Sequence, residues 1–194
     1  MLKSLDLKKV VTIVATLNLS YFFVEFYMAK NIESVSLFAD SIDFLEDASV
    51  NILILLAMGW SIKQRARVGY FLAFTLLIPG IAVLFSAWHK FFNPSAPEAL
   101  KLGLTGLGAL AVNLFCALLL AKFRKLNESL TKAAYLSARN DAFANVAIIC
   151  AGAATTLWVS GWPDLLVGIG ILILNLDSAT EVLEAAHREK KSAQ

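Results

Sequence analysis

The chain is poor in the residues that build disulfide-stapled and cysteine-zinc proteins. It has two cysteines, Cys116 and Cys150, and two histidines among 194 residues. Both cysteines lie inside long apolar runs, so we interpret them as packing residues and exclude a disulfide framework and a cysteine zinc motif. Charged residues are also scarce, at 16% of the chain, and the net charge is only +2. A chain with so little basic excess is not expected to have a nucleic acid partner.

Apolar residues, in contrast, make up 58% of the chain, which is far above the share found in soluble domains. Six stretches are long enough to cross the hydrocarbon core of a bilayer. They leave no room for a soluble domain, so we expect residues 1–194 to form a single transmembrane domain. The fold class predicted is an all-α integral membrane protein, a six-transmembrane-helix bundle with spans at about 9–29, 35–60, 69–89, 102–122, 132–159 and 164–186.

The lysines and arginines are divided unevenly between the two sides of such a bundle. Most of them fall in the N-terminal segment, in the second and fourth connections, and in the C-terminal tail. Only Lys30, Lys90 and Lys101 fall on the other side, and Arg139 lies inside a span. Positively charged connections stay in the cytoplasm, so we predict that both termini are cytoplasmic. This requires an even number of crossings, in agreement with six spans.

An acidic run interrupts the second span over residues 36–51. Four of its polar residues fall within about 60° of one another on a helix, namely Asp40, Asp43, Asp47 and Asn51. A carboxylate at membrane depth costs several kcal/mol unless it is paired, protonated or bound to an ion. We therefore interpret this acidic ladder as half of a divalent-cation site. Asp40, near the amino end of the helix, either complements the helix dipole or belongs to the site.

The fifth span carries the polar residues expected of a partner for this ladder. Ser137, Asp141 and Asn145 follow one another at four-residue intervals, and Asn140 is adjacent to Asp141. This spacing places oxygen-bearing groups on one strip of the helix. A lone acid within a span, such as Asp141, has few structural roles, which favours a functional one.

Other polar residues in the spans have simpler interpretations. Asn18 and Tyr21 of the first span are predicted to form interhelical hydrogen bonds, as polar groups between membrane helices do. Glu25 lies near the end of that span and is expected to reach water. In the third span, Pro79 followed by Gly80 predicts a kink. The pair Asp177 and Glu181, in the sixth span, is interpreted as a solvated helix end.

Residues 36–47 resemble the second-helix pattern of the cation diffusion facilitator family of metal/proton antiporters. In that pattern an Ala-Asp pair is followed by a His or Asp that lies four residues before another Asp, as Ala39-Asp40, Asp43 and Asp47 do here. Residues 140–146 are similar to the fifth helix of the family, and Pro163-Asp164 is similar to the opening of its sixth helix. Six spans and cytoplasmic termini agree with the family over nearly the whole chain.

The resemblance implies a set of metal ligands. Asp43 and Asp47 take the two places on the second helix, and Asp141 takes one on the fifth. The remaining place, usually His or Asp in the family, falls on Ser137, so Asn140 or Asn145 is a candidate substitute. The family usually has a cytoplasmic C-terminal domain as well, and the chain is interpreted as a short form without it.

The resemblance also implies a function, which is efflux of a divalent metal in exchange for protons by a homodimer in the cell membrane. The resemblance favours Zn²⁺ as the transported metal, followed by Cd²⁺ and Co²⁺, whereas a donor set made only of oxygen atoms favours Mn²⁺ or Fe²⁺. No cofactor is expected beyond the transported metal and the protons. The bilayer itself is the other partner.

Two other classes of protein are alternatives to a transporter. Phosphatidyltransferases also use intramembrane aspartates, but their Asp-x-x-Asp-Gly-x-x-Ala-Arg pattern fails because Phe44 follows Asp43 and no Ala-Arg pair follows at that spacing. We therefore predict that the protein is not an enzyme. The second class is a non-transporting membrane scaffold in which the ladder is a residual polar seam, and Ser137 at a ligand place keeps this alternative open.

Overall fold

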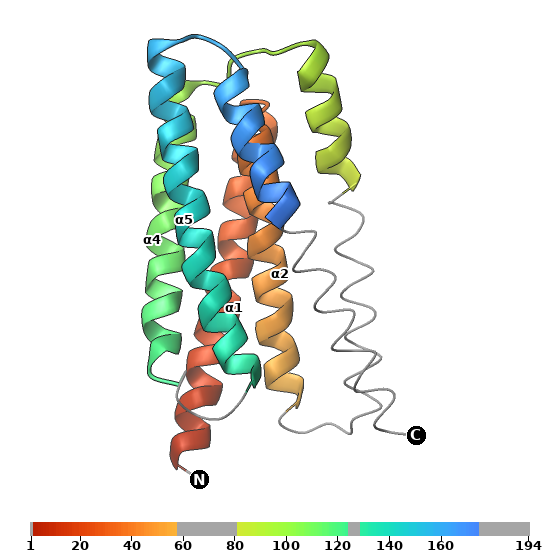
Figure 1. Ribbon diagram of the computed structural model, residues 1–194. Helices are drawn as coiled ribbons and strands as arrows, with labels where there is room; N and C mark the ends of the chain where they lie inside the picture. The colour runs from red at the N-terminus through yellow and green to blue at the C-terminus, as the bar shows by residue number, and fades with distance from the viewer. Residues whose placement is uncertain (1, 58–80, 124–128, 175–194) are drawn as a thin grey trace.

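The computed structural model describes residues 2–57, 81–123 and 129–174, and every regular element in these ranges is an α-helix. Figure 1 shows the long helices lying side by side in one bundle. The all-helical fold class is therefore confirmed for this part of the chain. The labelled helices are α1 (Leu2–Asn31), α2 (Val35–Ala57), α4 (Ala99–Ala121) and α5 (Ser129–Leu157), and two shorter apolar helices cover Ile81–Phe92 and Trp162–Leu174.

Two of these helices are long and apolar enough to cross a membrane by length and composition, over Leu7–Asn31 and Ala99–Ala121. Helix α2 has a similar length, but its acidic ladder lowers its hydropathy. The six-span count and the cytoplasmic position of the termini stay predictions, because residues 58–80 and 175–194 lie outside the described ranges. The same holds for the kink at Pro79-Gly80 and for the pair Asp177 and Glu181.

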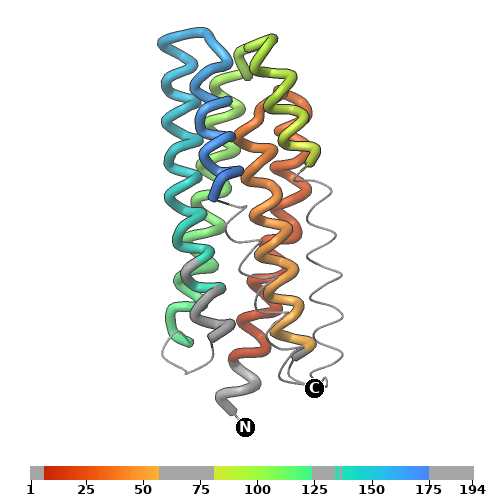
Figure 2. The backbone as a smooth tube through the Cα atoms, turned by 45° about the vertical axis from the view of Figure 1, so that its right-hand side comes forward, coloured from red at the N-terminus to blue at the C-terminus, as the bar shows by residue number. Residues whose placement is uncertain are grey.

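The four labelled helices form a closed ring around a central seam. Helix α1 packs against α2, α2 against α5, α5 against α4, and α4 against α1. Figures 1 and 2 show the three connections at 32–34, 93–98 and 158–161 gathered at one end of the bundle, which we call the turn end. Any side chain that points inwards from one of these helices therefore meets side chains of two others.

The first turn of the chain is made by Glu33 and Ser34. Glu33 has a φ of 52°, in the left-handed region that a non-glycine residue rarely adopts, and this ends α1. The Ser34 hydroxyl then accepts a hydrogen bond from the backbone N–H of Leu37 at 3.1 Å, which is the geometry of a helix N-cap. Helix α2 thus begins at a defined residue, and this start determines which face of the helix points into the bundle.

Apolar residues fill the bundle at both ends of the seam. A cluster near the turn end includes Leu37, Leu102, Ile148 and Leu165. A second cluster, near the other end, includes Val11, Val14, Ile54, Leu120 and Ala138. Between the two clusters the buried positions are largely polar. Outside the ring, large apolar side chains such as Phe85, Leu118 and Leu157 are exposed, as expected for a surface that faces lipid.

The helix Trp162–Leu174 touches the start of α2 at Gly168. A Cβ atom built at Gly168 would lie 2.9 Å from the backbone nitrogen of Ser36 and 2.9 Å from the carbonyl carbon of Val35, whereas one at Gly170 would meet nothing within 4 Å. We therefore expect Gly168→Ala to lower the thermal unfolding midpoint in detergent, because the backbone of α2 must move. Gly170→Ala, in the same helix, is the control and should leave the midpoint unchanged or raise it. Equal midpoints for both variants would contradict the close contact.

Candidate metal site

The acidic ladder of α2 points into the bundle. Asp40 is fully buried, Asp43 is 8% exposed and Asp47 is 4% exposed. Asn51, the last member of the ladder, donates its amide to the backbone oxygen of Asp47 at 2.7 Å, so it is bonded to its own helix. The polar groups of the seam that bond across helices fall into two layers, one around Asp47 and one around Asp40.

The Asp47 layer joins all four helices of the ring. The Ser137 hydroxyl of α5 donates to one carboxylate oxygen of Asp47 at 2.8 Å, and the Asn18 amide of α1 approaches the other at 3.4 Å. From α4, the Cys116 thiol donates to the amide oxygen of Asn18 at 3.7 Å. The interhelical hydrogen bond predicted for Asn18 is therefore confirmed, and Asp47 meets the α5 residue that the resemblance placed opposite it.

The Asp40 layer repeats this arrangement nearer the turn end. The Asn145 amide of α5 donates to Asp40 at 2.5 Å, and the Asn113 amide of α4 donates to the side-chain oxygen of Asn145 at 3.0 Å. Tyr21 of α1 donates its hydroxyl to the backbone oxygen of Thr105 at 2.7 Å, which confirms the interhelical bond predicted for it. The carboxyl group of Glu25 on α1 completes the layer.

The expectation that Glu25 reaches water is wrong, since its side chain is fully buried. Helix α1 continues past it to Asn31, so Glu25 lies almost two turns inside the helix rather than at its end. Aromatic rings cover this part of α1, with Phe26 and Phe38 packed edge to face at 5.4 Å.

Asp43 and Asp141 face the same region from α2 and α5, and their charges repel each other when both are ionised. Asp141 is half-buried. Among the described residues, however, no three acidic, histidine or cysteine side chains are grouped closely enough to hold a metal ion together. Asp47 instead has its oxygens occupied by Ser137 and Asn18.

Asn140 lies apart from the other predicted site residues. Its side chain is exposed, and its oxygen accepts a hydrogen bond from the Arg139 guanidinium at 3.2 Å. Of the two amides considered as substitutes for a fourth ligand, Asn145 is buried in the seam and Asn140 is not.

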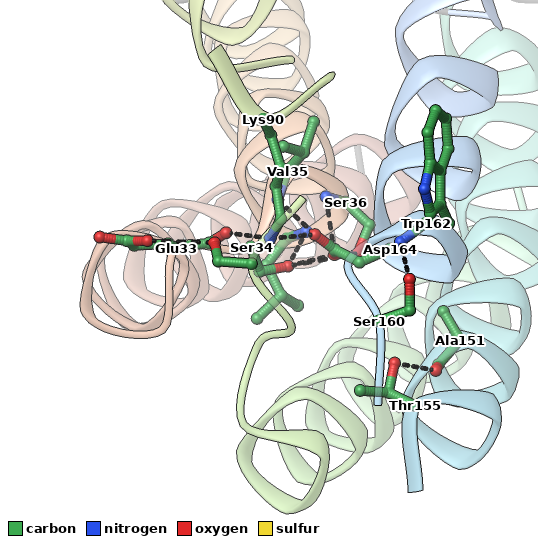
Figure 3. A network of polar contacts seen from close by, with 12 residues as sticks. Glu33, Ser34, Val35, Ser36, Lys90, Ala151, Thr155, Ser160, Trp162 and Asp164 are labelled. Carbon is green, nitrogen blue, oxygen red and sulfur yellow. Dashed lines mark hydrogen bonds and ion pairs between the residues drawn. The ribbon is translucent and has the colours of Figure 1, made fainter. Parts of the chain in front are cut away.

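A second buried polar centre, which the sequence reasoning missed, lies at the turn end around Asp164. Figure 3 shows the start of α2 and Lys90 converging on this carboxylate. The hydroxyls of Ser34 and Ser36 each donate to one oxygen of Asp164 at 2.6 Å, and the backbone N–H of Val35 donates to the other at 2.9 Å. An acid from the last described helix therefore holds the first turn of α2.

Lys90 completes this centre. Its ammonium group lies 2.9 Å from Asp164 and also donates to the backbone oxygen of Glu33, and its side chain is 5% exposed. In the sequence, Lys90 was assigned only to the non-cytoplasmic side, together with Lys30 and Lys101. The signal that could have found it is a lysine at the end of the third predicted span and an acid at the start of the sixth, both on the same side.

The arrangement described so far, a buried acidic helix face opposed by hydroxyl and amide groups of a second helix, agrees with a comparison against known families. The model of the cation efflux transmembrane domain matches residues 11–188. The chain belongs to the cation efflux family. This is the family, also known as the cation diffusion facilitators, that the second-helix motif resembled.

Curated relatives of this cation efflux protein include the zinc transporter ZitB of Yersinia pseudotuberculosis serotype I (strain IP32953) and that of Yersinia pestis. Each is 27% identical to it over 178 residues, which cover 80% of this chain and 56% of the relative. The chain thus spans little more than half the length of these relatives. Family membership makes it a membrane protein of a transporter family and sets aside the enzyme alternatives.

Proposed function

We propose that the protein exports divalent metal cations across the cell membrane in exchange for protons, through a site between α2 and α5. The observation that carries this proposal is the set of buried carboxylates on α2 that meet polar groups of α5, with Asp47 bonded to Ser137 at 2.8 Å and Asp40 bonded to Asn145 at 2.5 Å. Buried acids inside a membrane bundle mark ion pathways, because they are too costly to keep otherwise.

In this proposal the metal is held by Asp43, Asp47 and Asp141, with the Ser137 hydroxyl in the fourth place. Asn140 is given no contact with the ion because it is exposed. Zn²⁺ is the proposed cargo, which the names of the Yersinia relatives support. The oxygen donors of this chain also suit Mn²⁺ and Fe²⁺, so these ions, with Cd²⁺ and Co²⁺, belong in any test of selectivity.

Exchange follows from the chemistry of the ligands. A carboxyl group must lose its proton before it binds a metal, so metal and protons compete for the same oxygens. In the proposal, the apolar clusters that fill the two ends of the seam separate the site from both sides of the membrane in this conformation. Transport then requires a second conformation in which one of the two ends opens. A homodimer embedded in the bilayer remains part of the proposal through the family resemblance alone.

Metal-dependent thermal stability of the purified protein tests the site. We expect Zn²⁺ to raise the unfolding midpoint of the wild type. At a free Zn²⁺ concentration one hundred times the dissociation constant, binding should add about 2.7 kcal/mol to the free energy of unfolding. Asp43→Ala should reduce this stabilisation, whereas Asn140→Ala, at an exposed position of α5, should retain it in full. A repeat with Mn²⁺, Fe²⁺, Co²⁺ and Cd²⁺ would rank the cargo ions.

The outcome that would contradict the proposal is a wild-type protein whose midpoint none of these metals shifts. That result would favour the scaffold alternative, in which the polar seam only holds the helices together. A shift of undiminished size in Asp43→Ala would place metal binding elsewhere in the chain.

A further inference from the structure

Glu25 of α1 is the least satisfied ionisable group that the structure describes. It is fully buried, and neither of its carboxyl oxygens has a hydrogen-bond partner. One oxygen of Asp40, Oδ1, is buried without a partner as well. Three acceptor oxygens from two helices therefore lie within the bundle with no donor. Buried acceptors without partners, and carboxylates above all, carry a free-energy cost of several kcal/mol.

These two carboxyl groups lie next to each other, close enough for their charges to interact directly. The polar groups nearest to them are already engaged. Asn145 donates to the other oxygen of Asp40, and the Tyr21 hydroxyl, which lies near both carboxyl groups, donates to the backbone oxygen of Thr105. Two adjacent acids whose three open oxygens meet no amide, hydroxyl or ammonium donor among the described residues can be satisfied by a proton shared between them or by a bound cation.

This pair is separate from the Asp47 layer along the bundle. Glu25 follows Asn18 by seven residues on α1, and Asp47 follows Asp40 by seven residues on α2, so the two layers are about 10 Å apart along the helix axes. Metal–oxygen bonds in proteins are about 2.0–2.6 Å long, so one ion cannot be bound by Glu25 and Asp47 at once. Asp43 lies between them, about 4.5 Å from Asp40 along the helix axis. The Glu25 pair lies on the side of the turn end.

We propose that Glu25 and Asp40 form a second binding site for the transported divalent cation, which the ion occupies between the site at Asp43, Asp47 and Asp141 and the turn end. Two carboxylates provide hard oxygen ligands, and water completes the coordination shell. The inference rests on the proposed function, since it takes the cargo to be a divalent metal. A pathway with two successive sites lets an ion leave the first without crossing the apolar cluster in one step.

Zn²⁺ binding stoichiometry, measured on the purified full chain by equilibrium dialysis, tests this proposal. The wild type is expected to bind about two ions per chain and Glu25→Gln about one, because a neutral amide is a poor ligand for the ion. Asp47→Ala should lose the other ion and keep the one that depends on Glu25. Glu98→Gln, an equivalent change at an exposed glutamate, is the control and should bind as the wild type does.

Glu25→Gln should also fold, because its new amide group can donate to the open oxygen of Asp40. Its unfolding midpoint without metal is expected to match or exceed that of the wild type. Asp40→Asn is the second variant, and it should lose the same ion as Glu25→Gln.

Equal Zn²⁺ stoichiometry for the wild type, Glu25→Gln and Asp40→Asn would overturn the second site. If Glu25→Gln then differed from the wild type only in the number of protons released when zinc binds, Glu25 would be a proton-binding residue instead. A single ion that Asp47→Ala removes and Glu25→Gln retains would overturn the second site and leave the proposed function standing. If the wild type binds no zinc or other divalent metal, both proposals fall.

Discussion

Vesicles that contain the variant with both Asp47→Ala and Asp141→Ala are expected to show a zinc flux more than about 100-fold below that of the wild type. The two substitutions remove a carboxylate from α2 and one from α5, and the remaining Asp43 and Ser137 hold a divalent ion too weakly to compete with water. Zinc-sensitive and pH-sensitive dyes trapped in the same vesicles report the two fluxes together. An imposed proton gradient should drive zinc in the opposite direction only in the wild type.

Asn140→Ala is the matched control for this experiment, because Asn140 neighbours Asp141 in sequence but is exposed and bonded to Arg139. It should transport zinc at the wild-type rate. The thermal unfolding midpoint of each variant, measured before reconstitution, separates loss of transport from loss of folding. Undiminished, proton-coupled zinc flux in a folded double variant would refute the site between α2 and α5.

The second large effect is expected at Lys90. Replacing it by methionine should destabilise the protein by about 3–5 kcal/mol, because the buried Asp164 then loses its ion-pair partner among the described residues. Lys101 provides the control within the same chain. It pairs with Glu98 at a similar distance of 2.7 Å, but the two side chains are 43% and 53% exposed, so Lys101→Met should cost no more than about 1 kcal/mol. Denaturation in mixed micelles gives both values.

A double-mutant cycle isolates the ion pair from its surroundings. Lys90→Met combined with Asp164→Asn should be less damaging than the sum of the single changes, since the neutral side chain no longer leaves a charge unpaired. If Lys90→Met and Lys101→Met have the same small effect, the buried network around Asp164 does not stabilise the bundle in the way described.

The helices themselves were readable from the sequence because each is long, apolar and bounded by polar residues. The predicted span at 102–122 corresponds to Ala99–Ala121, and that at 132–159 corresponds to Ser129–Leu157. Their ends differ by one to three residues, since the helices begin and end in polar flanks that hydropathy alone does not delimit. The face of α2 that points inwards was likewise predictable, because helical periodicity places its acids on one side.

The partners of these polar residues were less accessible, because they depend on which helices are neighbours. Ser137 opposite Asp47 followed from the family resemblance. The pairing of Asn113 with Asn145 had no local signal, since one amide in α4 looks like any other polar group in an apolar helix. For the same reason Glu25 was expected to reach water, and Lys90 was assigned only to one side of the bundle. Each lies near a span end, and only the packing of other helices buries it.

The capping of α2 has a consequence for how the chain is made. Asp164 receives the backbone N–H groups of Val35 and Ser36, which precede it by 129 and 128 residues. During synthesis α2 is therefore made before its first turn can bond to Asp164, because the ribosome produces the last described helix later. A nascent chain released before that point would lack these bonds at the start of α2, so we expect the proposed transport site to be fully assembled only late in biogenesis.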